Sequence, residues 1–130
     1  MARGRPLRIV GASVSRPPDE VVGRVLDLAV RVALRHGDPE PTSEDVDLVD
    51  ARGPGHGLPS PEGEAAAAVA LRTEGLVLDP VYTAKALAAL PSVAGDGPAL
   101  FWHTGGLLDA VAGWVGAAPS SIPGVSGVAS

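Results

Sequence analysis

Residues 7–37 read LRIVGASVSRPPDEVVGRVLDLAVRVALRHG, and this stretch decides the fold class. It begins with a short apolar run followed by small polar residues, which is typical of a buried strand in a parallel sheet. Apolar residues then recur at helical spacing from Val21 to Ala33. Pro17 and Pro18 suit the start of that helix, and Gly37 suits its end. A strand that leads directly into an amphipathic helix favours an α/β architecture.

The rest of the chain continues this alternation. Ser60 is a good N-cap with Pro61 at the first helical position, and Gly75 closes the same helix. The remaining predicted elements are, in chain order, a strand over 46–50, the helix over 60–75, an extended piece over 76–79, a helix from Asp79 to about Leu90, a strand within 98–106 that runs into a Gly-rich loop, and a helix over 107–117.

This order predicts an α/β fold in the form of a partial three-layer domain, with a mostly parallel sheet and flanking helices. Three strands make a thin sheet with two open edges, which expose unpaired backbone groups. The sequence therefore resembles part of an α/β domain. We expect this partial domain to span residues 1–118 and residues 119–130 to form a flexible tail.

Composition argues against several classes of protein. The 130 residues suit one domain, and the absence of cysteine excludes disulfides and thiolate metal sites. The net charge is −5 and the basic residues are scattered along the sequence, so no nucleic-acid partner is expected. The three histidines lack the spacing of a metal site. Because no segment resembles a signal peptide or a membrane span, we expect a cytoplasmic protein.

Residues with functional potential gather after the predicted strands. Ligands of open parallel sheets bind beyond the carboxyl ends of the strands. Three loops would lie there, over 13–15, 52–57 and 103–106, with the helix start at 80–83 beside them. This edge would collect two histidines and three hydroxyl side chains: His56, Tyr82, Thr83, His103 and Thr104.

Each of these residues also has a structural interpretation. The GPGHG segment at 53–57 is consistent with a flexible turn, His103 with a loop anchor and Tyr82 with a core residue. Lys85 is the only lysine, which suggests Schiff-base chemistry, but an exposed or structural lysine is the better interpretation.

Four motifs together point to a family. They are GASVSRP at 11–17, GPGHGLPSPEG at 53–63, RTEGLVLDPVYTAKAL at 72–87 and LFWHTGG at 100–106. In this order they resemble the C-terminal part of the pyridoxal-phosphate enzymes of the D-cysteine desulfhydrase and aminocyclopropane-carboxylate deaminase family, which have the tryptophan synthase beta-like fold type II. The resemblance runs from about residue 7 to 106. It implies pyridoxal phosphate as cofactor and elimination from a small amino acid to sulfide, pyruvate and ammonia.

The resemblance also implies residue roles. Tyr82 would be a catalytic hydroxyl on the substrate side of the cofactor, and His56 replaces a family tyrosine at a position that shuttles protons or holds a carboxylate. Thr83 and Thr104, with Gly105 in the same loop, would bind the cofactor near its pyridine nitrogen. Since the deaminase branch carries glutamate where Thr83 stands, the sequence leans to the desulfhydrase branch.

The departures from the family limit this interpretation. The Schiff-base lysine and the phosphate-binding loop of the family lie upstream of Leu7, and Lys85 matches a different family lysine. We therefore expect a truncated lyase that is inactive alone, so whether the chain itself is an enzyme stays open. The alternatives are a non-catalytic partner module that completes its sheet on another chain, and a binder of phosphate ligands at GPGHG. The family implies a homodimer, and a complementing N-terminal half is the other candidate partner.

Overall fold

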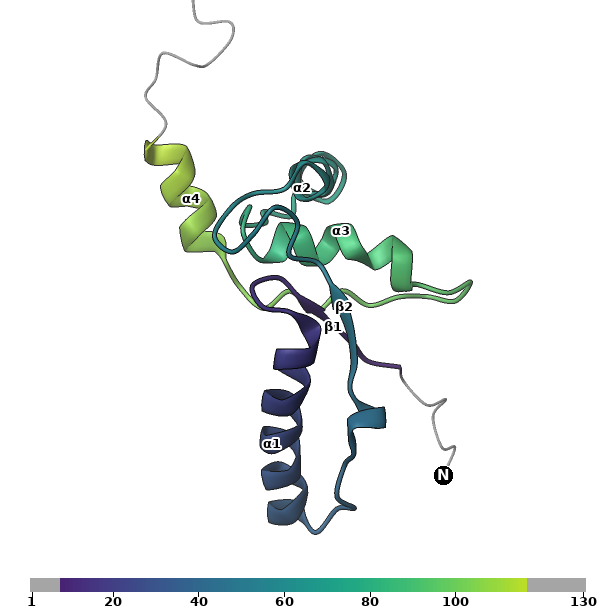
Figure 1. Ribbon diagram of the computed structural model, residues 1–130. Helices are drawn as coiled ribbons and strands as arrows, with labels where there is room; N and C mark the ends of the chain where they lie inside the picture. Colours follow the sequence, from purple (N-terminus) through teal and green to yellow (C-terminus); the bar gives the residue numbers. More distant parts are fainter. Residues whose placement is uncertain (1–7, 117–130) are drawn as a thin grey trace, which may run out of the picture.

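The computed structural model describes residues 8–116, and Figure 1 shows how its elements are arranged. Helices α2 and α3 lie together at one end of the strands, whereas α1 extends away from the other end (Figure 1). The expected tail over 119–130 lies outside the described residues. In chain order the elements are β1 (Val10–Ser13), α1 (Pro18–His36), the 3-10 turn η1 (Ser43–Asp45), β2 (Asp47–Asp50), α2 (Pro61–Glu74), α3 (Thr83–Val93) and α4 (Leu107–Gly116).

The sheet consists of two parallel strands. Val10 of β1 pairs with Asp47 of β2, and Ser13 pairs with Asp50. The Ala51 N–H donates to the Ser13 carbonyl oxygen at 2.9 Å, which extends the hydrogen bonding one step beyond the ladder. Helix α1 makes the crossover that parallel strands require. This arrangement confirms the predicted class, a partial α/β domain, although both strands are shorter than the sequence suggested.

The prediction of a third strand over 98–106 is wrong for the described residues. The side chains do alternate as in a strand, since Leu100 and Trp102 are 77% and 79% exposed while Phe101 and His103 are half-buried. Within residues 8–116, however, no backbone hydrogen bond joins this segment to β1 or β2. Pro98 also has no N–H to donate. The alternation instead reflects Phe101 packing on the core from an extended segment.

The core lies between α2 and α3. Ala70, Leu78 and Ala84 are buried there, and four half-buried apolar residues pack against them. Gly63 permits close approach of the two helices, because a Cβ at this position would lie 3.0 Å from Ser60 Oγ and 3.3 Å from the Lys85 backbone nitrogen. Ser60 caps α2 as predicted, and its Oγ accepts a 3.1 Å hydrogen bond from the Gly63 N–H.

Helix α1 begins and ends as the sequence predicts. Pro18 is its first residue, and Gly37 ends it with a φ of 72° while its N–H donates to the Ala33 carbonyl oxygen. Ala33 is nevertheless the only buried residue of the helix. The described residues therefore leave much of its apolar side uncovered, including the exposed side chains of Val25, Leu28, Val32 and Leu34.

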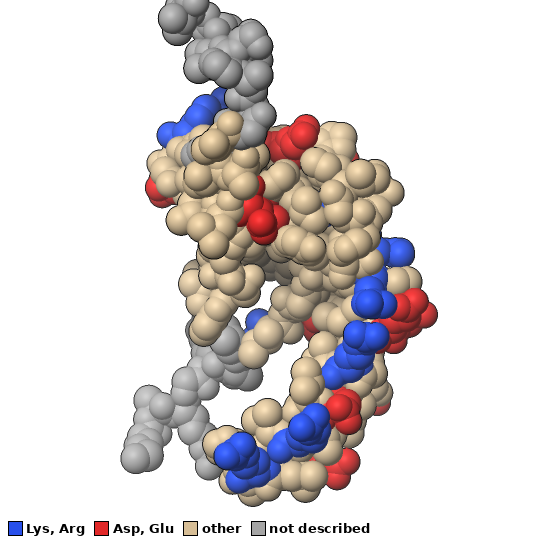
Figure 2. All heavy atoms as spheres, turned by 90° about the vertical axis from the view of Figure 1, so that its left-hand side faces the viewer, with Lys and Arg blue, Asp and Glu red and all other residues tan. Residues whose placement is uncertain are grey.

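Basic side chains are less scattered in space than in sequence. Arg24, Arg31 and Arg35 are exposed and spaced by seven and four residues, so they share one face of α1. Figure 2 shows a row of basic side chains along this helix with acidic ones beside it. The helix also carries three acidic residues, which balance the three arginines. No helix in the described part of the chain has the length and apolar character to cross a membrane.

Candidate active site

The turn before α3 is built around the Asp79 carboxylate, which is almost completely buried. Its Oδ1 accepts hydrogen bonds from the N–H groups of Val81 (3.0 Å) and Tyr82 (2.6 Å). Its Oδ2 accepts from the Thr83 N–H (2.9 Å) and the Thr83 hydroxyl (2.5 Å). These donors are groups that a helix start leaves without partners. The predicted helix start at Asp79-Pro80 is therefore shifted, because residues 80–82 form a turn around the carboxylate and α3 begins at Thr83.

The same hydrogen bonds set the charge state of Asp79. Burial alone would raise its pKa, but the hydrogen bonds from the Thr83 hydroxyl and from the N–H groups of Thr83, Tyr82 and Val81 favour the ionised form, so the pKa is lowered overall. A buried negative charge at the start of α3 also suits the helix dipole. Asp79 is thus an ionised N-terminal anchor that fixes the backbone on which Tyr82 is presented.

The loop over 103–106 lies directly against this anchor. Gly106 has a φ of +98°, and a Cβ at that position would overlap the Asp79 carboxylate. His103 holds the loop from its other end, because its Nε2 lies 3.1 Å from the Val77 carbonyl oxygen and its Nδ1 accepts the Gly105 N–H at 3.3 Å. This pattern fits a neutral imidazole protonated at Nε2. His103 therefore anchors the loop, as the structural interpretation predicted.

We expect Gly106→Ala to destabilise the protein more than Gly105→Ala, a matched control one residue away. Both glycines have positive φ, but a Cβ at Gly105 would meet nothing within 4 Å. Backbone strain should cost about 1–2 kcal/mol in either variant, and the clash with Asp79 should cost about 2 kcal/mol more in Gly106→Ala. Urea unfolding of the two variants measures the difference, and equal losses would show that the loop does not press on Asp79.

The loop over 52–57 brings His56 to Tyr82. The two rings lie 6.4 Å apart between centroids and are tilted by 57°. Both side chains are exposed, with Tyr82 at 44%. At the start of the loop, Arg52 donates hydrogen bonds to the Asp50 carboxylate that lower the pKa of Asp50 to about 2. Near the middle of the loop, Lys85 Nζ donates to the carbonyl oxygens of Arg52 (2.7 Å) and Gly55 (2.9 Å).

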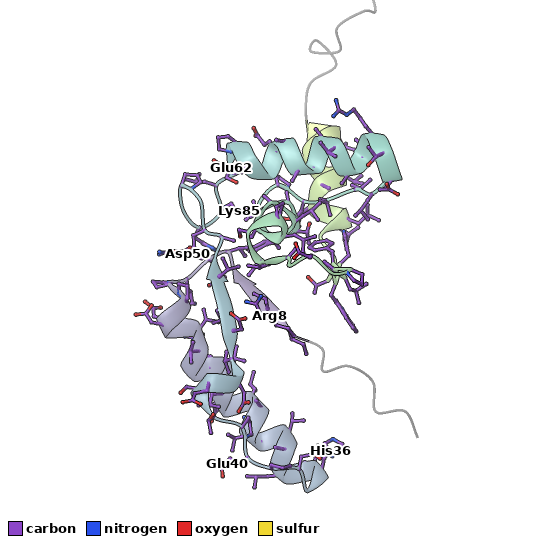
Figure 3. The ribbon with its side chains drawn as sticks, turned by 90° about the vertical axis from the view of Figure 1, so that its right-hand side faces the viewer. Arg8, His36, Glu40, Asp50, Glu62 and Lys85 are labelled. Carbon is purple, nitrogen blue, oxygen red and sulfur yellow. The ribbon has the colours of Figure 1, made fainter. Side chains whose placement is uncertain are left out.

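Among the described residues, this candidate site is an open surface rather than an enclosed cavity. The larger pocket, about 550 Å³, is an apolar groove between α2 and α3 that neither His56 nor Tyr82 lines. A second pocket of about 290 Å³ is lined by Lys85, Asp50 and Glu62, among others. Figure 3 shows these three side chains at the same end of the molecule, where β2 ends and α2 begins.

The structure brings some of the predicted site residues together and separates others. His56 and Tyr82 come together, as expected for a shared site. Thr83 is buried, and its hydroxyl donates to Asp79 and accepts from the Asp79 N–H at 2.9 Å, so it has no hydrogen left to donate to a cofactor. Thr104 is exposed, whereas the Gly105 N–H is engaged by His103. The cofactor roles of Thr83, Thr104 and Gly105 remain predictions.

The two buried charged side chains of the site, those of Asp79 and Lys85, were not identified from the sequence. Asp79 was assigned only to a helix start, although Asp-Pro with threonine four residues later is a pattern able to cap that start through both side chains. Lys85 was interpreted as exposed or structural; its burial rules out the first, and its two carbonyl partners support the second. Its burial was not foreseen, and a single lysine among alanines was the available signal.

No lysine of the chain is placed to anchor pyridoxal phosphate covalently. Lys85 is the only one in the sequence, and its ammonium is buried and bonded to two backbone carbonyl oxygens. The residues from 8 to 116 therefore do not by themselves fit the cofactor. Nor do any three of their histidine and acidic side chains group closely enough to hold a metal ion.

Comparison with known proteins identifies relatives of the chain. No protein-family model matches it. The D-cysteine desulfhydrase of Yersinia enterocolitica is 38% identical over 107 residues, which cover 75% of this chain and 32% of that protein. The enzymes of that name from Yersinia pestis and Yersinia pseudotuberculosis are 38% identical over 105 residues, with the same coverage. This chain thus spans about a third of the length of the curated relatives it matches. It is a relative of the D-cysteine desulfhydrases, as the four sequence motifs indicated.

Proposed function

We propose that this chain supplies the substrate-facing wall of a pyridoxal-phosphate site that eliminates sulfide from D-cysteine. The observation that carries the proposal is the placement of Tyr82 beside His56 in a chain related to D-cysteine desulfhydrases. In the overall reaction, the proton on Cα and the Cβ–S bond are lost, and water then replaces the amine. D-cysteine and water thus yield hydrogen sulfide, pyruvate and ammonia.

Tyr82 and His56 can have different roles in this reaction. Tyr82 lies on a turn whose backbone is fixed by Asp79, and its side chain is exposed, so its hydroxyl is accessible for moving a proton. His56 lies on a separate loop and faces the same space, where it would bind the substrate carboxylate or relay the proton. A cytoplasmic location, as expected from the sequence, and a homodimeric assembly, as the family resemblance implies, belong to the same proposal.

The cofactor and its covalent anchor belong to a segment other than residues 8–116, because Lys85 is already bonded. The most direct test therefore mixes this chain with the N-terminal part of the Yersinia enterocolitica relative, where the family resemblance implies the Schiff-base lysine and the phosphate-binding loop. We expect sulfide release from D-cysteine by the mixture and none from either component alone. Methylene-blue detection of sulfide measures this, and size-exclusion chromatography reports assembly. Co-elution of the two components without any sulfide release would contradict the proposed function.

Exposed apolar side chains favour a second candidate, a non-catalytic partner module. Leu100 and Trp102 are more than three-quarters exposed on the segment that runs past the sheet, and Leu108 of α4 is 85% exposed. Surfaces of this kind commonly mark interaction sites. Co-elution without turnover in the same mixture would favour this candidate, since the apolar faces would then assemble without forming a working site.

A further inference from the structure

Lys85 lies in the first turn of α3, and its side chain is among the most deeply buried in the described residues, at 2% exposure. Its ammonium donates to two carbonyl oxygens of one loop, those of Arg52 and Gly55, which are 33 and 30 positions away in sequence. The loop closes tightly around it. Gly53 has a φ of +61°, and a Cβ there would lie 2.8 Å from Ser60 Cβ and 3.9 Å from Lys85 Cε.

A buried ammonium at this place is costly. It lies near the positive end of the α3 dipole, and desolvating it is unfavourable by several kcal/mol. No carboxylate in the described part of the chain lies within ion-pair distance of its Nζ, although Asp50 and Glu62 line the adjacent pocket and add longer-range attraction. The compensation at close range comes from two neutral carbonyl dipoles. Two carbonyl oxygens that converge on one point need a donor between them, and here the Lys85 ammonium supplies both hydrogen bonds, so the loop conformation is tied to this group.

The consequence reaches the candidate site. The carbonyl of Gly55 is linked directly to the nitrogen of His56, and Tyr82 stands three residues before Lys85 at the same helix start. One element therefore carries both the tyrosine and the ammonium that holds the histidine loop. We infer that Lys85 is a positioning residue, a built-in cation that fixes the 52–57 loop so that His56 faces Tyr82. This inference goes beyond the proposed function and holds whatever reaction the site performs.

Proton NMR of the full chain tests the inference without any activity. The wild-type protein should show nuclear Overhauser contacts between the His56 and Tyr82 rings, whose centroids are 6.4 Å apart. Lys85→Met keeps an unbranched side chain that is one atom shorter, and it removes the charge and both hydrogen bonds. We expect this variant to remain folded by circular dichroism and to lose the ring contacts.

Chemical rescue separates charge from packing. Lys85→Ala leaves space that n-propylammonium matches in length and charge, whereas n-propanol matches it in size alone. We expect saturable recovery of the His56–Tyr82 contacts with propylammonium and none with propanol. Equal recovery with both would show that the lysine acts only by filling space. Global unfolding of Lys85→Met, or a Lys85→Met spectrum that retains the ring contacts, would also overturn the inference.

Discussion

Tyr82→Phe should lower sulfide release by the complemented assembly by about 10²–10⁴-fold, the range expected when a general acid–base group is removed. The substitution deletes only the hydroxyl. The N–H that Asp79 accepts belongs to the backbone and is kept, and the ring can still face His56. Turnover should therefore fall while assembly and thermal stability stay unchanged. Sulfide assays on the assembly, at equal amounts of co-eluting complex, measure the effect.

Two further variants make this result specific. Thr104→Val, in the exposed loop beside the Asp79 turn, should alter the absorption spectrum of the cofactor in the assembly more than it alters turnover. His56→Tyr restores the residue that the family resemblance implies and should raise turnover if the loop keeps its position. Full activity of the assembled Tyr82→Phe variant would identify the tyrosine as a packing residue and would contradict its catalytic role.

Asp79→Asn should destabilise the protein by about 2–4 kcal/mol, the largest stability effect that we expect from a single polar substitution here. Asparagine has nearly the same size, but its amide group would point N–H donors at the N–H and hydroxyl of Thr83, which now bond to a carboxylate oxygen. Because the site is buried, water cannot compensate the lost bonds. Chemical denaturation at neutral pH measures the loss, with Asp96→Asn at an exposed turn as the control.

The pH dependence of this effect has a defined sign. The pKa of Asp79 is lower in the folded state than in the unfolded chain, where it is about 3.9. Its contribution is therefore complete above the unfolded pKa and is lost as the pH falls through the folded pKa. The stability gap between the wild type and Asp79→Asn should narrow below about pH 4. A gap that stays constant down to pH 2 would show that the carboxylate is not the stabilising form.

Local signals in the sequence predicted much of the fold. The caps at Ser60 and Gly37, the parallel pairing of the first two strands and the helix over 60–75 follow from short-range patterns, and all are present. The prediction of a third strand was wrong because a segment can be extended, with one face packed on the core, without pairing with a sheet. Whether such a segment joins a ladder depends on backbone partners elsewhere in the fold, which periodicity does not report.

The candidate site was also predictable only in part. The meeting of His56 and Tyr82 was predictable from topology, because the loop after β2 and the start of the helix that carries Tyr82 were expected beside each other at one edge of the sheet. Two features could not be predicted in this way: the hydrogen bonds that Asp79 makes to Thr83, and the burial of Lys85 under a loop distant in sequence. Each depends on which buried polar atoms lack other partners, and that is decided only when the chain has folded.

The contact between Gly106 and Asp79 bears on how this chain could be recombined with its relatives. A recombination point between residues 79 and 106 would take Asp79 from one parent and the loop over 103–106 from another. If the two did not fit, the turn over 80–82 that carries Tyr82 would move. Chimeras that inherit residues 77–106 from a single parent keep His103, Gly106 and Asp79 in register. The same reasoning joins residues 52–60 to that block through Lys85. Helix α1 packs instead on β2 and η1, so it is better exchanged together with those elements.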